Sequence, residues 1–265
     1  SDFLFYVNFY FIKYRRKVVE LNLVNSFPEK SKAELLNIEK KFFRILTDYI
    51  VESLKSFTIS KKAILTKGKI IENPEMTALL KEKRNIIISV GHVGNQELVN
   101  LFMSASPDFA FTLKAAYHQL ANPYFDQFFH QSRTRFGSQM YTMKGAHLAI
   151  HKQDLDRPFA FFLVNDQSSP PNKSYWTNFL NQETSFYKGM AVFAKKYDMP
   201  VFFMHLVRPK RGQFELSFVK ITDEPTKATE NEILEKHVRL LENNILEDPQ
   251  IWLWSHKRWK HKKPE

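Results

Sequence analysis

Cysteine is absent from the 265-residue chain, and glycine is scarce, with only 7 residues. The absence of cysteine excludes disulfides, cysteine-ligated zinc, iron–sulfur clusters and a thiol nucleophile. Because glycine is placed where the backbone needs room or a positive φ, each of these few glycines is informative. Hydrophobic residues make up 43% of the chain and charged residues 25%, so disordered and collagen-like classes are also excluded.

Acidic residues are outnumbered by basic ones. The chain has 28 Asp and Glu against 39 Lys and Arg, which gives a net charge of +11. This excess predicts an anionic partner, of which nucleic acid, acidic lipid headgroups and an acidic carrier protein are the main classes.

The N-terminal apolar segment, from Phe3 to Ile12, is too short to span a bilayer, which takes about 20 helical residues. A basic cluster follows it: Lys13, Arg15, Arg16 and Lys17. This order is the reverse of a secretory signal peptide. It is typical of a helix at an anionic membrane interface. The end of a spanning helix that lies upstream, or an ordinary first helix packed on the core, would show the same pattern.

Helix and strand patterns alternate along most of the chain. Ser31 and Glu34 form a capping-box pattern, and the apolar residues after them predict a long amphipathic helix over residues 31–57. Strands are predicted at 85–90, 109–113, 159–164, 201–206 and 214–219, and further helices at 98–105, 123–136, 144–151, 189–197 and 232–246. This alternation predicts an α/β fold with a mainly parallel central sheet and flanking helices.

One domain boundary is expected. Residues 60–84 are polar and look irregular, and they separate the helical N-terminal part from the α/β part. We therefore divide the chain into an N-terminal helical, membrane-associated segment (1–57) and one compact α/β domain (58–265).

The main chemical signal follows the first predicted strand of the α/β part, in the segment from Gly91 to Glu97. Ligands of open α/β sheets bind beyond the carboxyl ends of strands, and His92 stands at such an end. If His92 lies in the loop and Glu97 in the first turn of the next helix, the two can meet. A carboxylate that holds an imidazole makes it a general base, here acting on a substrate hydroxyl. In the alternative, Asn95 caps the helix, Glu97 complements its dipole and His92 is structural.

The same segment resembles a known family. Gly91-His92-Val93-Gly94-Asn95-Gln96-Glu97 is similar to the GHxGNWE signature of the lipid A biosynthesis (lauroyl/myristoyl) acyltransferases, except that Gln96 stands where the family usually has Trp. Further blocks resemble the family in the same order: Asn122-Pro123-Tyr124-Phe125-Asp126, the stretch with Arg133, Arg135, Phe136 and Gly137, Lys144-Gly145-Ala146, Asn165-Asp166-Gln167, and Trp254-Ser255-His256-Lys257-Arg258-Trp259.

The resemblance implies a glycerolipid-acyltransferase-like fold at the cytoplasmic face of a bacterial inner membrane. It implies an enzyme that moves a fatty acyl chain from acyl carrier protein, or from CoA, to a hydroxyl of a lipid A-like acceptor, without a metal or other cofactor. His92 would be the base and Glu97 its partner. Substrate-binding roles fall to Asn95, Asn122, Asp126, Asp166 and the arginines Arg133 and Arg135, which would hold headgroup charge or the thioester oxyanion.

Other functions remain open at this stage. An acyltransferase of the same mechanism could act on an aminolipid or a lysophospholipid. A non-enzymatic basic module for membrane or nucleic acid would explain the charge alone, although we expect no nucleic acid partner. A metal hydrolase built on His92, Glu97, Asp166 and a second histidine is disfavoured, because the nine histidines show no H-E-x-x-H or similar spacing.

Overall fold

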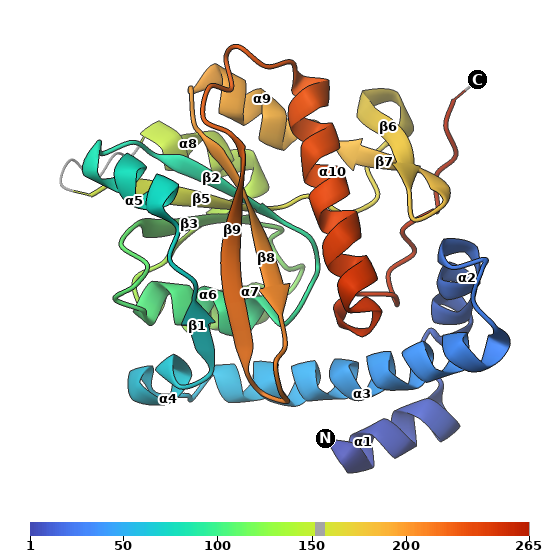
Figure 1. The fold of residues 1–265 in the computed structure, drawn as a ribbon. Helices are drawn as coiled ribbons and strands as arrows, with labels where there is room; N and C mark the ends of the chain where they lie inside the picture. The colour runs from blue at the N-terminus through green and yellow to red at the C-terminus, as the bar shows by residue number, and fades with distance from the viewer. Residues whose placement is uncertain (152–156, 265) are drawn as a thin grey trace.

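A seven-stranded sheet forms the centre of the molecule (Figure 1). The structure, a computed structural model, describes residues 1–151 and 157–264. The strand order is β1-β9-β8-β2-β5-β3-β4, and every neighbouring pair is parallel except β8 and β9. The strands are β1 (Gly68–Ile70), β2 (Ile86–Val90), β3 (Thr112–Tyr117), β4 (Gln139–Thr142), β5 (Phe159–Val164), β8 (Val201–Val207) and β9 (Phe214–Thr222). The predicted mainly parallel α/β fold is confirmed.

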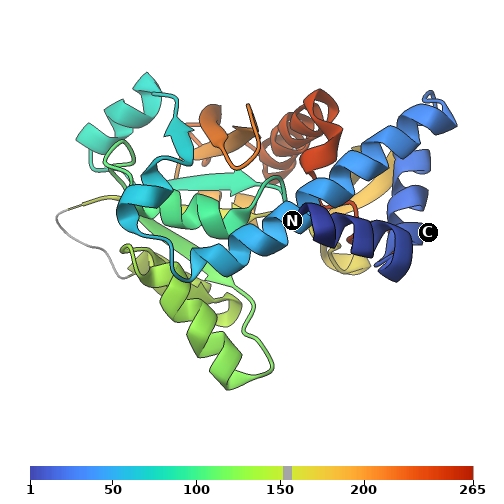
Figure 2. The same cartoon turned by 90° about the horizontal axis from the view of Figure 1, so that it is seen from below.

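Helices cover both faces of this sheet. Figure 2 shows α10 (Glu230–Glu247) on one side and α6 (Gln96–Ala105) with α7 (Pro123–Thr134) on the other. The remaining helices are α4 (Lys61–Leu65), α5 (Pro74–Lys81), α8 (Ala146–His151), α9 (Gly189–Lys196) and the short 3-10 turns η2 (Met143–Gly145), η3 (Pro171–Lys173) and η4 (Pro249–Ile251). With both faces covered, β2 is buried at all five residues, as expected for a central parallel strand.

The N-terminal part consists of helices that lie along one edge of the α/β part (Figure 1). They are α1 (Asp2–Tyr6), the π-helix η1 (Val7–Ile12), α2 (Arg16–Ser26) and α3 (Lys32–Ser56). The predicted capping box starts α3: the Ser31 hydroxyl accepts from the Glu34 amide at 3.3 Å, and the Glu34 carboxylate accepts from the Ser31 amide at 2.8 Å. The predicted long helix is therefore confirmed.

One face of the first two helices packs on α3, and the other face is open. Phe5 and Phe9 are buried, and the rings of Phe9 and Phe43 lie 5.6 Å apart. Phe3 and Phe11, by contrast, are 78% and 81% exposed. Within the described ranges, no helix combines the length and the apolar character that crossing a bilayer requires.

Some elements differ from the sequence-based expectation. Residues 60–84, predicted to be irregular, contain α4, β1 and α5. The predicted elements also lack β4 and the hairpin of β6 (Ser174–Phe179) and β7 (Gln182–Tyr187), which forms a separate two-stranded sheet. The third sheet strand begins at Thr112 and not at 109.

Candidate active site

Two loops meet at the carboxyl ends of neighbouring strands. The strands β2 and β5 are parallel, with Val90 opposite Val164, so the residues that follow each strand lie side by side. The amide of Asn165 donates to the carbonyl of Val90 at 2.9 Å, which continues the pairing for one more residue. This geometry brings His92, after β2, to Asp166, after β5, in the crevice where open α/β sheets bind ligands.

His92 and Asp166 form a tight pair. The imidazole Nδ1 lies 2.5 Å from Oδ1 of Asp166, and the His92 backbone amide donates to Oδ2 at 2.7 Å. The indole of Trp252 donates to the same Oδ2 at 2.8 Å. The Asp166 side chain is 1% exposed and that of His92 is 27% exposed. The carboxylate is thus fixed inside the protein, while the imidazole it holds remains accessible.

The electrostatics of the pair favour an ionised carboxylate beside a basic imidazole. Burial alone would lower the pKa of His92, but the charge and hydrogen bond of Asp166 outweigh it and raise that pKa above its ordinary value. Burial also acts on Asp166, yet the contacts from His92 and Trp252 hold the pKa of Asp166 well below its usual range. Such a pair has the arrangement of a general base with its orienting acid.

The loop that carries His92 needs its glycines. A Cβ on Gly91 would lie 2.8 Å from Oδ2 of Asp166 and 2.5 Å from Cδ1 of Leu241. Gly94 has a φ of +74° and lies against Leu206. The side chain of Gln96 donates to the carbonyls of Gly91 and Val93 at 3.2 and 2.7 Å. Gln96, which departs from the family signature, therefore stabilises the turn by bonding the residues on either side of His92.

The C-terminal segment also supports this loop. The amide of Leu253 donates to the carbonyl of His92, and the amide of Gly94 donates to the carbonyl of Ile251, both at 3.2 Å. The two segments form an antiparallel bridge between Val93 and Trp252. The C-terminal segment thus helps to build the site, since Trp252, two residues before the block from Trp254 to Trp259, donates to Asp166 directly.

The expected pair of His92 and Glu97 is replaced by a different one. Glu97 lies in the first turn of α6 and binds Arg133 of α7, with Nη2 2.5 Å and Nε 3.0 Å from its carboxylate oxygens. The carboxylate that holds the His92 imidazole, at Nδ1, is that of Asp166 and not that of Glu97. The predicted pair of His92 and Glu97 is therefore wrong. The partner of His92 is Asp166, which follows the neighbouring strand β5, and not a residue of the helix α6 that follows His92. A catalytic contribution of Glu97 stays a prediction.

Glu97 and Arg133 belong to a second polar cluster. The Arg133 guanidinium lies 5.9 Å from the ring centre of Tyr117, whose hydroxyl donates to Asp126 at 3.3 Å. Glu97, Tyr117 and Arg133 line a small cavity of about 150 Å³, together with Phe162 and Val164 near the end of β5. Arg133 and Asp126, both predicted as substrate-binding residues, are thus brought into one cluster.

The remaining predicted residues have structural contacts. Asn95 caps α6 by accepting from the amides of Glu97 and Leu98, and Asn122 caps α7 by accepting from Tyr124 and Phe125. Arg135 donates to the carbonyls of Phe57 and Ile59, which fastens the end of α7 to the segment after α3. The Asn95 side chain therefore acts as a helix cap, as the alternative interpretation of the sequence expected.

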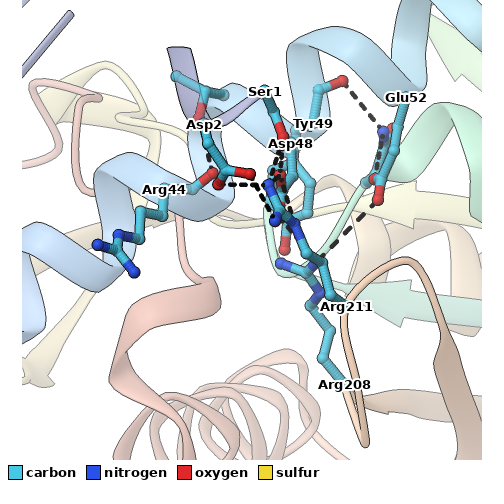
Figure 3. A network of polar contacts seen from close by, with 10 residues as sticks. Ser1, Asp2, Arg44, Asp48, Tyr49, Glu52, Arg208 and Arg211 are labelled. Carbon is cyan, nitrogen blue, oxygen red and sulfur yellow. Dashed lines mark hydrogen bonds and ion pairs between the residues drawn. The ribbon is translucent and has the colours of Figure 1, made fainter. Parts of the chain in front are cut away.

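The start of α6 is held by α3 as well. The Asn95 amide group donates to the carbonyl of Tyr49 at 3.3 Å and to the Glu52 carboxylate at 3.2 Å. Figure 3 shows this part of α3, where Arg208 approaches Glu52 and Arg211 points to Asp48. The Arg211 guanidinium lies 2.7 Å from the Asp48 carboxylate. The charged network therefore links the N-terminal helices to the helix that follows His92.

Two residues at the site could not be recognised from the sequence. Trp252 carries no signal that would pair it with Asp166, because 86 residues separate the two. Gln167, whose Nε2 lies 3.4 Å from Nε2 of His92, was visible only as part of the block from Asn165 to Gln167. Of the phenylalanines of β5 and β8, Phe159, Phe161, Phe202 and Phe203 are at most 1% exposed and form the core, whereas Phe162 lines the small cavity beside Glu97 and Arg133.

The parallel sheet, with an accessible His92 held by a buried acid at the carboxyl ends of its strands, has the arrangement of an α/β enzyme. The sequence matches the family of bacterial lipid A biosynthesis acyltransferases over residues 3–261, and the chain belongs to this family. A search of curated proteins finds no match. The chain is accordingly an acyltransferase enzyme, which decides against the basic binding module and the metal hydrolase.

Proposed function

We propose that the protein transfers a fatty acyl chain from a thioester, carried by acyl carrier protein or CoA, to a hydroxyl of a lipid A-like acceptor. The observation that carries this proposal is the pair of an accessible His92 and a buried Asp166. Membership of the acyltransferase family supplies the reaction class. The donor, the acceptor and the residues that act on them are the parts we propose.

The steps follow from the two ring nitrogens of His92. Asp166 holds Nδ1, so Nε2 is the nitrogen that accepts the proton of the acceptor hydroxyl. The oxygen then attacks the thioester carbonyl, and a tetrahedral oxyanion forms. When the intermediate collapses, the carbon–sulfur bond breaks and the thiolate takes the proton back from the imidazolium. The products are an ester and a free thiol, and the enzyme is regenerated.

Arg133 is the arginine we assign to charge binding. Arg135 is engaged with the carbonyls of Phe57 and Ile59, whereas the Arg133 side chain is 24% exposed and lines the small cavity beside the end of β5. Its pair with Glu97 fixes the guanidinium, and a fixed guanidinium suits a phosphate or an oxyanion. The assignment gives Glu97 an orienting function through Arg133.

We further propose that the enzyme works at the cytoplasmic face of a bacterial inner membrane. Acyl carrier protein, CoA and lipid phosphates are all anionic, and the net charge of +11 would steer them to the protein. The exposed aromatic side chains of the first two helices, next to Lys13 and Lys17, have the composition of an interfacial anchor.

The test is acyl transfer by the purified protein, with mass spectrometry of the lipid products. We expect His92→Ala to lower turnover by about 10²–10⁴-fold, the usual contribution of a general base. His205→Ala is the matched control, because His205 also pairs with a carboxylate, that of Glu247, on a strand outside the site. Full turnover by His92→Ala would contradict the proposal. Transfer to an aminolipid or lysophospholipid, but not to a lipid A precursor, would keep the mechanism and change the acceptor.

A further inference from the structure

Arg258, in the C-terminal segment, carries a buried guanidinium whose hydrogen bonds are incomplete. The residue is 1% exposed. Its Nη2 donates to the carbonyl of Ser185 in β7 at 2.5 Å, whereas the buried Nε and Nη1 find no partner among the described residues. Buried charges in proteins are as a rule paired and hydrogen-bonded. A guanidinium that is held inside the protein without full pairing therefore calls for a physical reason.

Arg258 is fastened to the loop that carries Asp166. The Ser168 hydroxyl, two residues after Asp166, donates to the carbonyl of Arg258. From β7, the Ser185 hydroxyl donates to the carbonyl of Ser169 at 3.2 Å, in the same loop. Arg258 is thus hydrogen-bonded to the loop through its carbonyl and to β7 through its guanidinium. This arrangement fixes a cation behind the acid of the site.

The charge of Arg258 acts on the pair of His92 and Asp166. Burial lowers the pKa of Arg258 to about 10, against the attraction of Asp166, so the guanidinium is charged at pH 7. The same charge opposes the protonation of His92. While the imidazole is neutral, Asp166 and Arg258 carry one charge of each sign. A proton on His92 adds a second positive charge to this buried set.

The other ionisable groups around the pair are neutral or already paired. His237 of α10 is fully buried, which lowers its pKa to about 4. Burial also lowers the pKa of His256 in the C-terminal segment. The Tyr187 hydroxyl of β7 donates its proton to a backbone carbonyl at 3.3 Å. Glu97 of α6 pairs with Arg133. None of these groups offsets the cation that the C-terminal segment holds.

We propose that Arg258 is a positioning residue of the active site, which stabilises the ionised Asp166 carboxylate and favours the neutral imidazole of His92 at rest. The inference rests on the proposed function and deepens it, because it names a residue that acts on the base without touching a substrate. A neutral imidazole can accept the proton of the hydroxyl. A nearby cation destabilises the imidazolium, which then returns the proton more readily to the leaving thiolate.

Histidine titration by NMR tests the proposal without turnover. The full chain is labelled with nitrogen-15 in histidine, and His92→Ala identifies the signal of His92. Arg258→Met removes the charge, and Arg258→Gln removes it but keeps an N–H group for the carbonyl of Ser185. In both variants we expect the pKa of His92 to rise by about 0.5–1 unit. Arg258→Lys, which keeps the charge, should lie closer to the wild type than either.

Turnover supplies a second readout that a purely structural role would not move. In Arg258→Met, the rise of kcat/KM with pH should shift to higher pH by the same amount as the pKa of His92. Activity should therefore fall about three- to tenfold at a pH below the rise, and the difference should disappear above it. A variant that was only less stable would lose activity at every pH alike.

Arg208→Met is the matched control. The Arg208 side chain is 9% exposed, and its guanidinium lies 5.3 Å from the ring centre of Tyr49, as that of Arg258 lies 4.5 Å from the ring centre of Phe186. A carboxylate of α3 lies 3.5 Å from the Arg208 guanidinium and compensates its charge. The control should leave both the pKa of His92 and the pH of the rise unchanged.

Two results would overturn the proposal. One is an unchanged pKa of His92 in folded Arg258→Met and Arg258→Gln, because the charge would then not reach the base. The other is failure of both neutral variants to fold, seen by circular dichroism, which would assign the guanidinium to stability. A protein in which the pKa of His92 shifts as expected but which transfers no acyl chain would instead refute the proposed function and leave the action of Arg258 on the pair intact.

Discussion

At the scale of single residues, the site depends on which carboxylate reaches His92. The sequence predicts that His92 and Asp166 lie at the ends of strands, and it indicates both as residues of the site. Their pairing was not predictable, because it requires β5 to lie beside β2, and 74 residues separate the two side chains. The spacing of five residues between His92 and Glu97 favoured a local pair, yet the long-range contact is the one that forms.

Gly91 leads to a prediction at this scale. Gly91→Ala should lower the free energy of unfolding by about 1–3 kcal/mol, because a Cβ would crowd Leu241 in the core and the fixed Oδ2 of Asp166. It should also lower activity, since relief of that contact moves the carboxylate. Urea denaturation and acyl-transfer assays measure the two effects.

The control for this substitution is Gly189→Ala, where a Cβ would meet nothing within 4 Å. Its stability should equal or slightly exceed that of the wild type. If Gly91→Ala were as stable and as active as Gly189→Ala, the close packing of the His92 turn would not matter.

At the scale of secondary-structure elements, the long helices were easier to predict than the short strands. The apolar period and capping box of α3 placed its ends within one residue. The hairpin of β6 and β7 was missed because its turn residues, Leu180 and Asn181, both have positive φ (50° and 62°). Asn181 favours such a turn but Leu180 does not, so this two-residue connection lacks the Asn-Gly type of signal that marks a hairpin.

The contact between α6 and α7 gives a second prediction. The Glu97 and Arg133 side chains are only 23% and 24% exposed, so their ion pair is partly shielded from water. A double-mutant cycle with Glu97→Gln and Arg133→Met should give a coupling energy of about 0.5–3 kcal/mol in unfolding experiments.

A solvated ion pair provides the comparison for this cycle. Lys227 and Glu224 are 74% and 60% exposed, and their coupling should be the smaller of the two. Equal coupling in both cycles would mean that the pair between α6 and α7 adds nothing beyond a surface contact.

At the scale of the whole molecule, the N-terminal helices have two distinct faces. One face buries Phe5 and Phe9 on α3, as an ordinary first helix would. The other exposes Phe3 and Phe11, as an interfacial helix would. The sequence offered these as alternatives, and a helix with two faces can serve both. Composition alone could not separate them, because it does not show which residues share a face.

Vesicle binding tests the membrane-facing side. Lys13→Gln combined with Lys17→Gln should weaken binding to anionic vesicles by about 30-fold, since each cation near such a surface contributes about 1 kcal/mol. The effect should shrink as salt rises. Deletion of residues 1–17 is less informative, because it would uncover the surface that Phe5 and Phe9 bury.

The control variants remove two exposed lysines elsewhere, Lys81 at the end of α5 and Lys227 before α10. Their change to Gln alters net charge equally and should leave vesicle binding near the wild-type level. Equal weakening by both pairs would show that overall charge, and not this face, determines the attraction.

The most direct test of the account is the pH dependence of kcat/KM for the wild type, Asp166→Asn and Glu97→Gln. His92 must be neutral to accept a proton, and Asp166 raises its pKa, so wild-type activity should rise with pH through a value above the ordinary histidine pKa of about 6.5. Asp166→Asn removes the charge that favours the imidazolium. This rise should therefore move to lower pH, with kcat about 10²–10⁴-fold smaller. Glu97→Gln should leave the pH of the rise unchanged. A shift caused by Glu97→Gln but not by Asp166→Asn would contradict the central claim.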